Sequence, residues 1–203
     1  QAFLELPDEV IITSMKEHQR YFPVFKDGKL SNHFIVVSNA VTDDYSLIVS
    51  GNEKVLHARL SDGLFFYHND LKRGLLNDGL EKVVYMKGLG SLSEKLQRES
   101  SIAKHLFTNH KETVLANLGK TEEETNKLLE RLCEVSKADL MSEMVYEFTE
   151  LQGVMGYYYS CKLGEYDLVS LAIKEQYLPN GEDADLPSNH FSALIALAVK
   201  LDA

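Results

Sequence analysis

Four carboxylates have the spacing that comes nearest to a chemical site in this sequence. Asp139, Glu143, Glu147 and Glu150 would lie within roughly a quarter-turn of one another on a helix that advances about 100° per residue. No histidine lies among them to complete a transition-metal set. The stripe is therefore either a site or a solvated face, and we favour the solvated face because acidic helix surfaces are common.

No other pattern in the sequence names a catalytic residue. There is no glycine-rich phosphate loop, no G-x-S-x-G turn, no H-E-x-x-H pair and no paired C-x-x-C. The seven histidines are scattered, and a single histidine is more often a surface or core residue than a ligand: His18, His33, His57, His68, His105, His110 and His190. We predict no catalytic residue.

The carboxylate stripe would lie on a long core helix between Cys133 and Tyr159. Apolar residues recur there at three- and four-residue steps, which is the helical period. They are Leu140, Met144, Phe148, Leu151 and Met155. Gly153 and Gly156 would weaken the far end of this helix, and a break near Ser136 could separate it from the helix that begins at Thr121.

The first forty residues favour an antiparallel sheet. Residues 9–13, 21–25 and 33–38 are rich in β-branched and aromatic side chains and are predicted to be strands. The Asp-Gly pair in residues 26–29 favours a tight hairpin between the last two. Pro23 indicates an edge position or a bulge, because proline cannot donate to a ladder.

The period becomes helical after this sheet. Residues 51–76 carry a helical apolar stripe with Asn52 as a possible cap, and residues 80–86 extend the helical pattern. Glycines in residues 88–90 interrupt it, and we place the domain boundary there, which gives domains 1–86 and 87–203.

The second half is predicted to be helical throughout. Capping boxes begin helices at Ser91 and Thr121, a further helix covers residues 167–177, and Ser188 or Asn189 caps the last one. The expected fold class is therefore α+β, a small antiparallel β/α portion followed by a mostly helical domain.

Composition limits the function classes. The net charge of −10 argues against strong autonomous binding of nucleic acid. Cys133 and Cys161 lie in apolar patterns and are expected to be core residues in a reducing compartment, which indicates the cytoplasm. No apolar run approaches the ~20 residues that span a bilayer. The missing initiator methionine and the abrupt end of the last helical pattern suggest a piece of a longer polypeptide.

Three blocks together carry a specific resemblance. Residues 6–25 (LPDEVIITSMKEHQRYFPVF), 51–72 (GNEKVLHARLSDGLFFYHNDLK) and 137–165 (KADLMSEMVYEFTELQGVMGYYYSCKLGE) closely resemble the beta subunit of bacterial glycyl-tRNA synthetase. The likeness continues through residues 175–189 (EQYLPNGEDADLPSN) and the last helix. It therefore covers nearly the whole chain.

The resemblance implies a function shared between subunits. In that family, two alpha and two beta chains form a heterotetramer; the alpha chain activates glycine with ATP and Mg²⁺, and the beta chain binds tRNA(Gly). This chain would be an interior fragment of the beta subunit, without a cofactor of its own. Residues 1–86 look like the end of an editing-type domain similar to that of phenylalanyl-tRNA synthetase, and residues 87–203 look like a truncated helical domain of the HD superfamily.

The HD resemblance predicts an incomplete metal site. Active HD phosphohydrolases hold a divalent metal with a histidine, a His-Asp pair and a later aspartate; here the pair is Ala138-Asp139 and the later position is Val199. His105 is a conceivable first ligand, and Asp202 could replace Val199 only with a rotated helix. Since a catalytic metal needs about three protein ligands, we expect no metal and no phosphohydrolase activity, with Asp139 capping or pairing locally.

The tRNA-contacting role suggests which side chains would meet phosphates. The candidates are polar or cationic residues of the first domain and near the boundary. They are Lys16, Gln19, Arg20, Lys54, Arg59, Lys95 and Arg98. Ordinary solvated surface is an equally good interpretation of each. Tyr157, Tyr158 and Tyr159 could stack on an unpaired base, or be divided between core and surface.

Three functions remain open. The leading hypothesis is a non-catalytic, tRNA-contacting and scaffolding part of an aminoacyl-tRNA ligase. The alternatives are an active metal-dependent HD hydrolase and a protein-interaction module that holds the alpha chain.

Overall fold

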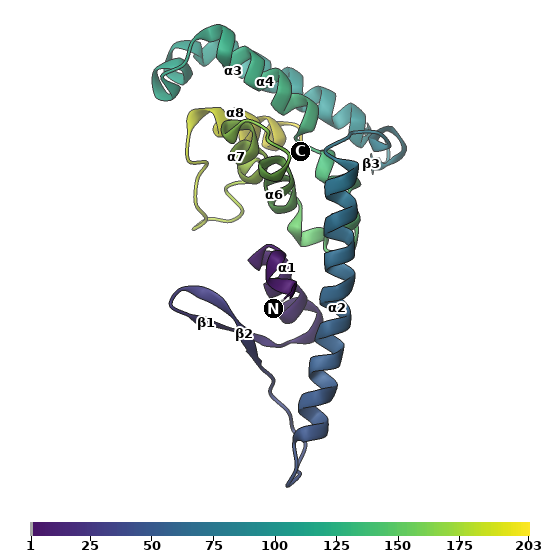
Figure 1. Ribbon diagram of the computed structural model, residues 1–203. Helices are drawn as coiled ribbons and strands as arrows, with labels where there is room; N and C mark the ends of the chain where they lie inside the picture. The colour runs from purple at the N-terminus through teal and green to yellow at the C-terminus, as the bar shows by residue number, and fades with distance from the viewer. Residues whose placement is uncertain (1) are drawn as a thin grey trace. The chain divides into compact units, whose positions relative to one another are not determined.

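The computed structural model describes residues 2–203, and they form two compact units. The first unit ends at Asn69 and the second extends from Asp70 to Ala203. The boundary expected at residues 88–90 lies inside the second unit. The units contain two small antiparallel sheets and many helices, several of which are labelled in Figure 1, and this confirms the predicted α+β class.

The first unit begins with helices, so the strand predicted for residues 9–13 was wrong. The elements are η1 (Ala2–Glu5), α1 (Asp8–Thr13) and the π-helix η2 (Ser14–His18). Val10 and Ile11 are 1% and 2% exposed on one side of α1, which lies in the core of this unit. A helix is favoured because proline precedes its first turn and two acidic residues lie in that turn, near the positive end of the helix dipole.

The predicted hairpin is confirmed in β1 (Phe22–Lys26) and β2 (Lys29–Ile35). Asp27 and Gly28 have φ angles of 52° and 75°, as a two-residue hairpin turn requires. The register shifts between Pro23 and Phe25, which confirms the bulge. The second strand begins and ends earlier than the predicted residues 33–38.

The long helix α2 (Ser46–Arg73) begins before the predicted cap. Asp44 accepts a hydrogen bond from the backbone N–H of Ser46 over 2.9 Å, whereas Asn52 lies inside the helix. The Asn52 side chain instead accepts a hydrogen bond from the Tyr21 hydroxyl over 2.7 Å. The prediction of Asn52 as a cap was therefore wrong, because its amide serves a tertiary contact.

The second unit begins with short elements and a helical hairpin. Only η3 (Leu80–Lys82) of the predicted helix 80–86 is helical, and β3 (Val84–Met86) pairs with β4 (Gly90–Ser91). Helices α3 (Leu92–Leu118) and α4 (Glu122–Val135) both begin at the predicted capping boxes.

The long core helix predicted for residues 133–159 was wrong. The segment divides into the end of α4, η4 (Ala138–Met141), α5 (Glu143–Glu147), η5 (Thr149–Leu151) and α6 (Val154–Lys162). The break expected near Ser136 is confirmed, because Ser136 is the C-cap of α4. Its apolar residues are nevertheless mostly buried, which is why the period resembled one helix. Ser142 caps α5 and Gly153, at φ 77°, precedes α6, so local polar contacts and a left-handed residue interrupt the helix.

Helices α7 (Asp167–Glu175) and α8 (His190–Leu201) complete the second unit. Asn189 caps α8, one of the two predicted caps, and α8 packs against α3 and α7. Cys133 lies in the core formed by these helices and α4, as predicted. The same prediction was wrong for Cys161, which is exposed on α6.

Candidate functional site

Asp139 is a buried acceptor and does not belong to an acidic stripe. Its side chain lies in η4 with the residue 1% exposed, and its Oδ2 accepts a hydrogen bond from the Gly153 N–H over 2.5 Å. Burial raises the pKa of Asp139, and the Gly153 N–H opposes that rise. Glu143, Glu147 and Glu150 are exposed on α5 and η5, so the predicted alignment of four carboxylates was wrong because it assumed one continuous helix.

The backbone of α6 lies very close to Asp139 and α7. A Cβ added at Gly156 would lie 2.5 Å from Ile173 Cγ2 and 3.1 Å from Asp139 Cγ. Gly156 therefore permits a close helix approach and does not merely weaken a helix end, as the sequence suggested.

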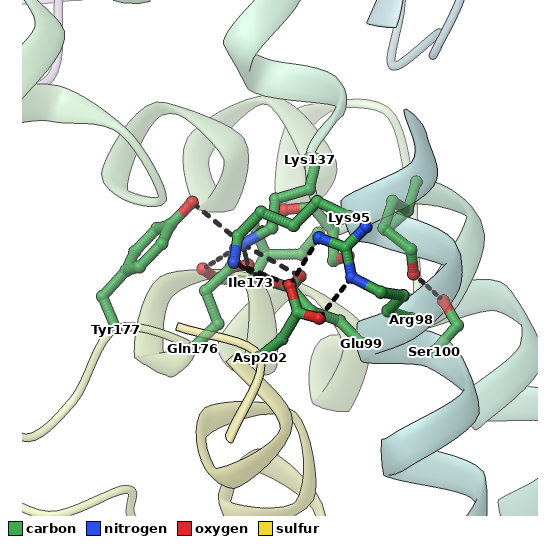
Figure 2. Close-up of polar contacts among 11 residues, drawn as sticks. Lys95, Arg98, Glu99, Ser100, Lys137, Ile173, Gln176, Tyr177 and Asp202 are labelled. Carbon is green, nitrogen blue, oxygen red and sulfur yellow. Dashed lines mark hydrogen bonds and ion pairs between the residues drawn. The ribbon is translucent and has the colours of Figure 1, made fainter. Parts of the chain in front are cut away.

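Lys137, directly before the Ala138-Asp139 pair, is buried with its ammonium among oxygen atoms. The residue is 2% exposed, and its Nζ lies 2.8 Å from Gln176 Oε1, 3.3 Å from the Tyr177 hydroxyl and 3.3 Å from Glu99 Oε2. Figure 2 shows these side chains converging from different segments. Burial lowers the pKa of Lys137, and the Glu99 carboxylate opposes that change.

The aromatic ring of Tyr177 covers another side of the Lys137 ammonium. The Lys137 Nζ lies 4.6 Å from the ring centroid, within the range of a cation–π contact. Burial raises the pKa of Tyr177 well above its usual value, and the carboxylates of Asp139 and Glu99 add to the rise. The phenol is therefore a neutral hydrogen-bonding group at physiological pH.

A second group of ion pairs joins α3 to the end of α8. Lys95 lies 3.1 Å from Glu99 and 3.1 Å from Asp202, and Arg98 contacts both carboxylate oxygens of Asp202 at 2.5 and 3.0 Å (Figure 2). The Arg98 hydrogen bonds, with those from Lys95, lower the pKa of Asp202. Asp202 is thus an ion-pair partner of two cations, a role that the sequence did not predict.

The positions expected for a degenerate metal site do not form a ligand set. His105 is exposed on α3 and its Nε2 lies 2.9 Å from the Asn109 amide, while Ala138 and Val199 pack in the core. Within residues 2–203, no three His, Cys, Asp or Glu side chains gather as metal ligands would.

The predicted phosphate contacts differ in their surroundings. Lys16, Arg20, Lys54 and Arg59 are exposed in the first unit, and Gln19 is half-buried there. In the second unit, Lys95 is 7% exposed and is engaged by two carboxylates, and the Arg98 side chain is 39% exposed beside Asp202. The cationic candidates of the first unit are therefore more exposed than those of the second.

The three consecutive tyrosines are divided between core and surface. Tyr159 is 2% exposed and its hydroxyl donates to Asp70 Oδ2 over 2.7 Å, while Tyr157 and Tyr158 are half-buried. Tyr159 is therefore a structural residue, and the Tyr157 ring lies 5.0 Å below the ammonium of Lys174.

Sequence reasoning missed the buried polar residues Asp70, Glu99 and Lys137. Glu99 lies on the apolar stripe of α3, three residues after Leu96 and four before Ala103, both of which are buried. A charge at an inward helical position is a signal for a buried ion pair. Asp70 carried the same signal, because it continues the buried stripe of α2 three residues after Tyr67. Lys137 carried none, because it lies beyond the end of α4.

Comparison with known proteins decides the family. A family model described as "Glycyl-tRNA synthetase beta subunit" matches residues 1–203. The chain belongs to the glycyl-tRNA synthetase beta-subunit family. This confirms the resemblance drawn from the sequence.

Relatives within this family cover the chain almost completely. This chain is 53% identical over 208 residues to the glycine–tRNA ligase beta subunit of Helicobacter pylori (strain Shi470). The aligned region covers 100% of this chain and 29% of that protein. The corresponding Bacillus subtilis (strain 168) subunit is 44% identical over 203 residues, with 98% and 29% covered. The chain thus spans about 29% of the length of these glycyl-tRNA synthetase beta subunits. Each helix in the described range of residues is too short or too polar to cross a bilayer.

Proposed function

We propose that this part of the glycyl-tRNA synthetase beta subunit supports the ATP-dependent attachment of glycine to tRNA(Gly) through tRNA contact and scaffolding, without catalysis of its own. The single observation that carries the proposal is the match of residues 1–203 to the beta-subunit family. The absence of three converging ligating side chains within residues 2–203 supports the non-catalytic role. ATP and Mg²⁺ would bind at the alpha subunit, in a cytoplasmic assembly of two alpha and two beta chains.

The tRNA contacts would come from the first unit. Lys16, Arg20, Lys54 and Arg59 are exposed cationic residues, and the half-buried Gln19 directly precedes Arg20. Backbone phosphates are the natural partners of such side chains, since contact releases counterions. We no longer propose Lys95 as a contact, because its ammonium is buried between Glu99 and Asp202; Arg98, half-exposed beside Asp202, is a weaker candidate.

The first unit would be completed by other parts of the subunit. Its sheet has two strands, and large apolar side chains on it remain exposed: Phe22 at 54%, Phe25 at 53% and Ile35 at 55%. A two-stranded sheet is marginally stable in water, and exposed apolar strands favour further pairing. These features support an editing-type domain of which residues 1–86 form only a part. The HD relationship of residues 87–203 is likewise a proposal.

The decisive experiment reverses two exposed charges in the complete enzyme. The double variant Lys54→Glu/Arg59→Glu of the full-length beta subunit is assembled with the alpha chain, and aminoacylation is measured against tRNA concentration. We expect KM for tRNA to rise and the salt dependence of tRNA binding to become shallower, since each lost phosphate contact lowers that slope by about 1. Glycine-dependent exchange between ATP and pyrophosphate should be unchanged, because it needs only the alpha active site.

A matched control separates tRNA contact from general charge. Lys127 is an exposed lysine of α4 in the second unit, and Lys127→Glu should leave KM for tRNA unchanged. An unchanged KM in the double variant would refute the tRNA surface. Loss of alpha-chain binding in size exclusion would instead favour the interaction-module alternative. No observed ligand set favours the HD hydrolase alternative, and we do not propose it.

A further inference from the structure

Three oxygen atoms surround the ammonium of Lys137 in the core of the second unit. The Lys137 Nζ lies 2.8 Å from Gln176 Oε1 and 3.3 Å from both the Tyr177 hydroxyl and Glu99 Oε2. The centroid of the Tyr177 ring lies 4.6 Å from the same Nζ. Figure 2 shows that the oxygens come from α3 and from the end of α7, while Lys137 enters from the turn after α4. This is the coordination that a cation receives from a binding site.

Two of the surrounding oxygens, those of Gln176 and Glu99, belong to groups with further contacts that do not involve Lys137. The Gln176 side-chain amide donates to Ser136 O over 2.7 Å and to Ile173 O over 2.9 Å, which fixes the direction of its Oε1. Glu99 is 0% exposed, and its other carboxylate oxygen lies 3.1 Å from the Lys95 ammonium. A buried group of such oxygens, one of them a carboxylate oxygen, would attract a small cation that could enter.

The formal charges of this region also favour a cation at that place. Counted as ionised groups, Glu99, Asp139 and Asp202 carry three negative charges and Lys95, Arg98 and Lys137 carry three positive ones, so the formal sum is zero. Removal of Lys137 would leave one uncompensated negative charge beside fully buried carboxylates. A buried charge that has lost its partner is strongly destabilising relative to the intact pair.

We propose that the Lys137 ammonium occupies a preformed cation site, a cage made by Glu99, Gln176 and Tyr177. If the lysine side chain were removed, this cage would bind a free alkylammonium or alkali cation. The site lies in a different unit from the tRNA contacts proposed above and does not depend on them. Its ligand class is a monovalent cation, because one carboxylate oxygen and two neutral oxygens surround the position.

The test shortens the Lys137 side chain and supplies the missing alkylammonium from solution. Lys137→Ala in the full-length beta subunit removes a fragment equivalent to n-propylammonium, and thermal unfolding is followed with increasing n-propylammonium chloride. We expect the melting temperature to fall by roughly 10 °C in the variant, as for breaking a buried ion pair, and to recover with saturation as n-propylammonium is added. Potassium chloride is tested in the same way.

Three controls make the recovery specific. 1-Propanol is added as an uncharged molecule of the same size as n-propylammonium. Tetramethylammonium chloride is added at the same ionic strength, because its cation is too large for the cage. Lys127→Ala is the matched variant, because Lys127 also lies over an aromatic ring, Tyr166 at 5.7 Å, but is exposed. The proposal would be overturned if 1-propanol restored the melting temperature of Lys137→Ala, or if n-propylammonium raised the melting temperatures of wild type and Lys127→Ala as much as that of Lys137→Ala. It would also be overturned if neither n-propylammonium nor potassium changed the melting temperature of Lys137→Ala.

A second pair of variants applies if Lys137→Ala does not fold. Lys137→Met retains the volume and leaves the Glu99 charge, while Lys137→Met/Glu99→Gln removes both charges. We expect the double variant to melt at a higher temperature than the single one, because Lys95 keeps its contact with Asp202 and no anion is left unpaired in the cage. A double variant no more stable than Lys137→Met would show that Lys137 does not act as the counter-cation of Glu99.

Discussion

The hydroxyl of Tyr159 donates a hydrogen bond over 2.7 Å to Oδ2 of Asp70, a residue 89 positions earlier in the chain. Asp70 is 4% exposed, and its carboxylate also accepts the backbone N–H groups of Glu143 and Met144 at 2.8 and 3.0 Å. One carboxylate thus satisfies the first turn of α5 and holds α6 beside it. Asp70 and Tyr159, whose contact the sequence did not predict, thus organise the connection between these short helices.

Tyr159→Phe should destabilise the second unit by about 1–3 kcal/mol, because it removes a hydrogen bond to a buried carboxylate. The measurement is urea unfolding of the full-length beta subunit. Tyr146→Phe is the control, since Tyr146 is 86% exposed and should change stability by less than about 0.5 kcal/mol. Unchanged stability of Tyr159→Phe would mean that this hydrogen bond contributes nothing, and a tRNA defect without a stability loss would restore the base-stacking interpretation.

Gly156→Ala should cost about 1–3 kcal/mol, because the added Cβ would lie 2.5 Å from Ile173 Cγ2 and force α6 away from α7. Gly51→Ala is the matched control. Gly51 lies inside α2 with nothing within 4 Å of its added Cβ, so alanine there should be neutral or stabilising by up to about 1 kcal/mol. Thermal unfolding distinguishes the two, and equal effects would show that helix propensity and not packing decides the result.

Asp202→Asn should destabilise the protein by about 1–2 kcal/mol at pH 7, through its contacts with Lys95 and Arg98. The Arg98 hydrogen bonds hold the pKa of Asp202 below its unfolded value, so the stabilisation is present above the unfolded pKa of about 3.9. It is lost as the pH falls through the folded pKa. Denaturant unfolding should therefore show the same difference from wild type at pH 7 and pH 5.5, and a smaller one below about pH 4. A difference that disappears by pH 5.5 would contradict this assignment.

Asp139→Ala should destabilise more than Asp139→Asn. Asparagine can keep an oxygen acceptor for the Gly153 N–H, whereas alanine leaves that buried donor without its partner, which costs about 1–3 kcal/mol. Burial raises the pKa of Asp139, so loss of its charge by itself is partly favourable. Comparison of both variants by urea unfolding tests the structural role, and addition of Mn²⁺ to the wild-type protein tests the alternative. A metal-dependent rise in its melting temperature would indicate that Asp139 ligates a cation.

The sequence predicted the elements whose signals are local. The capping boxes at Ser91 and Thr121 and the turn at Asp27-Gly28 are confirmed, because each is decided by residues three or fewer positions apart. Residues 133–159 could not be divided correctly, since their apolar residues keep a helical period while Asp70 and Gly153 impose the breaks. The family was identified from the sequence alone, but the buried Lys137 was not, because its partners in α3 and α7 are distant in the chain.

The neutral sum of charges around Glu99 has a consequence for sequence divergence in this family. A substitution that removes one buried charge would have to be accompanied by a second substitution that removes its partner. A protein that keeps only five of the six charges would be less stable. Glu99 and Lys137 should therefore change together among related chains, and Asp202 with Arg98 or Lys95. An alignment in which these positions vary independently would indicate that other groups can restore neutrality.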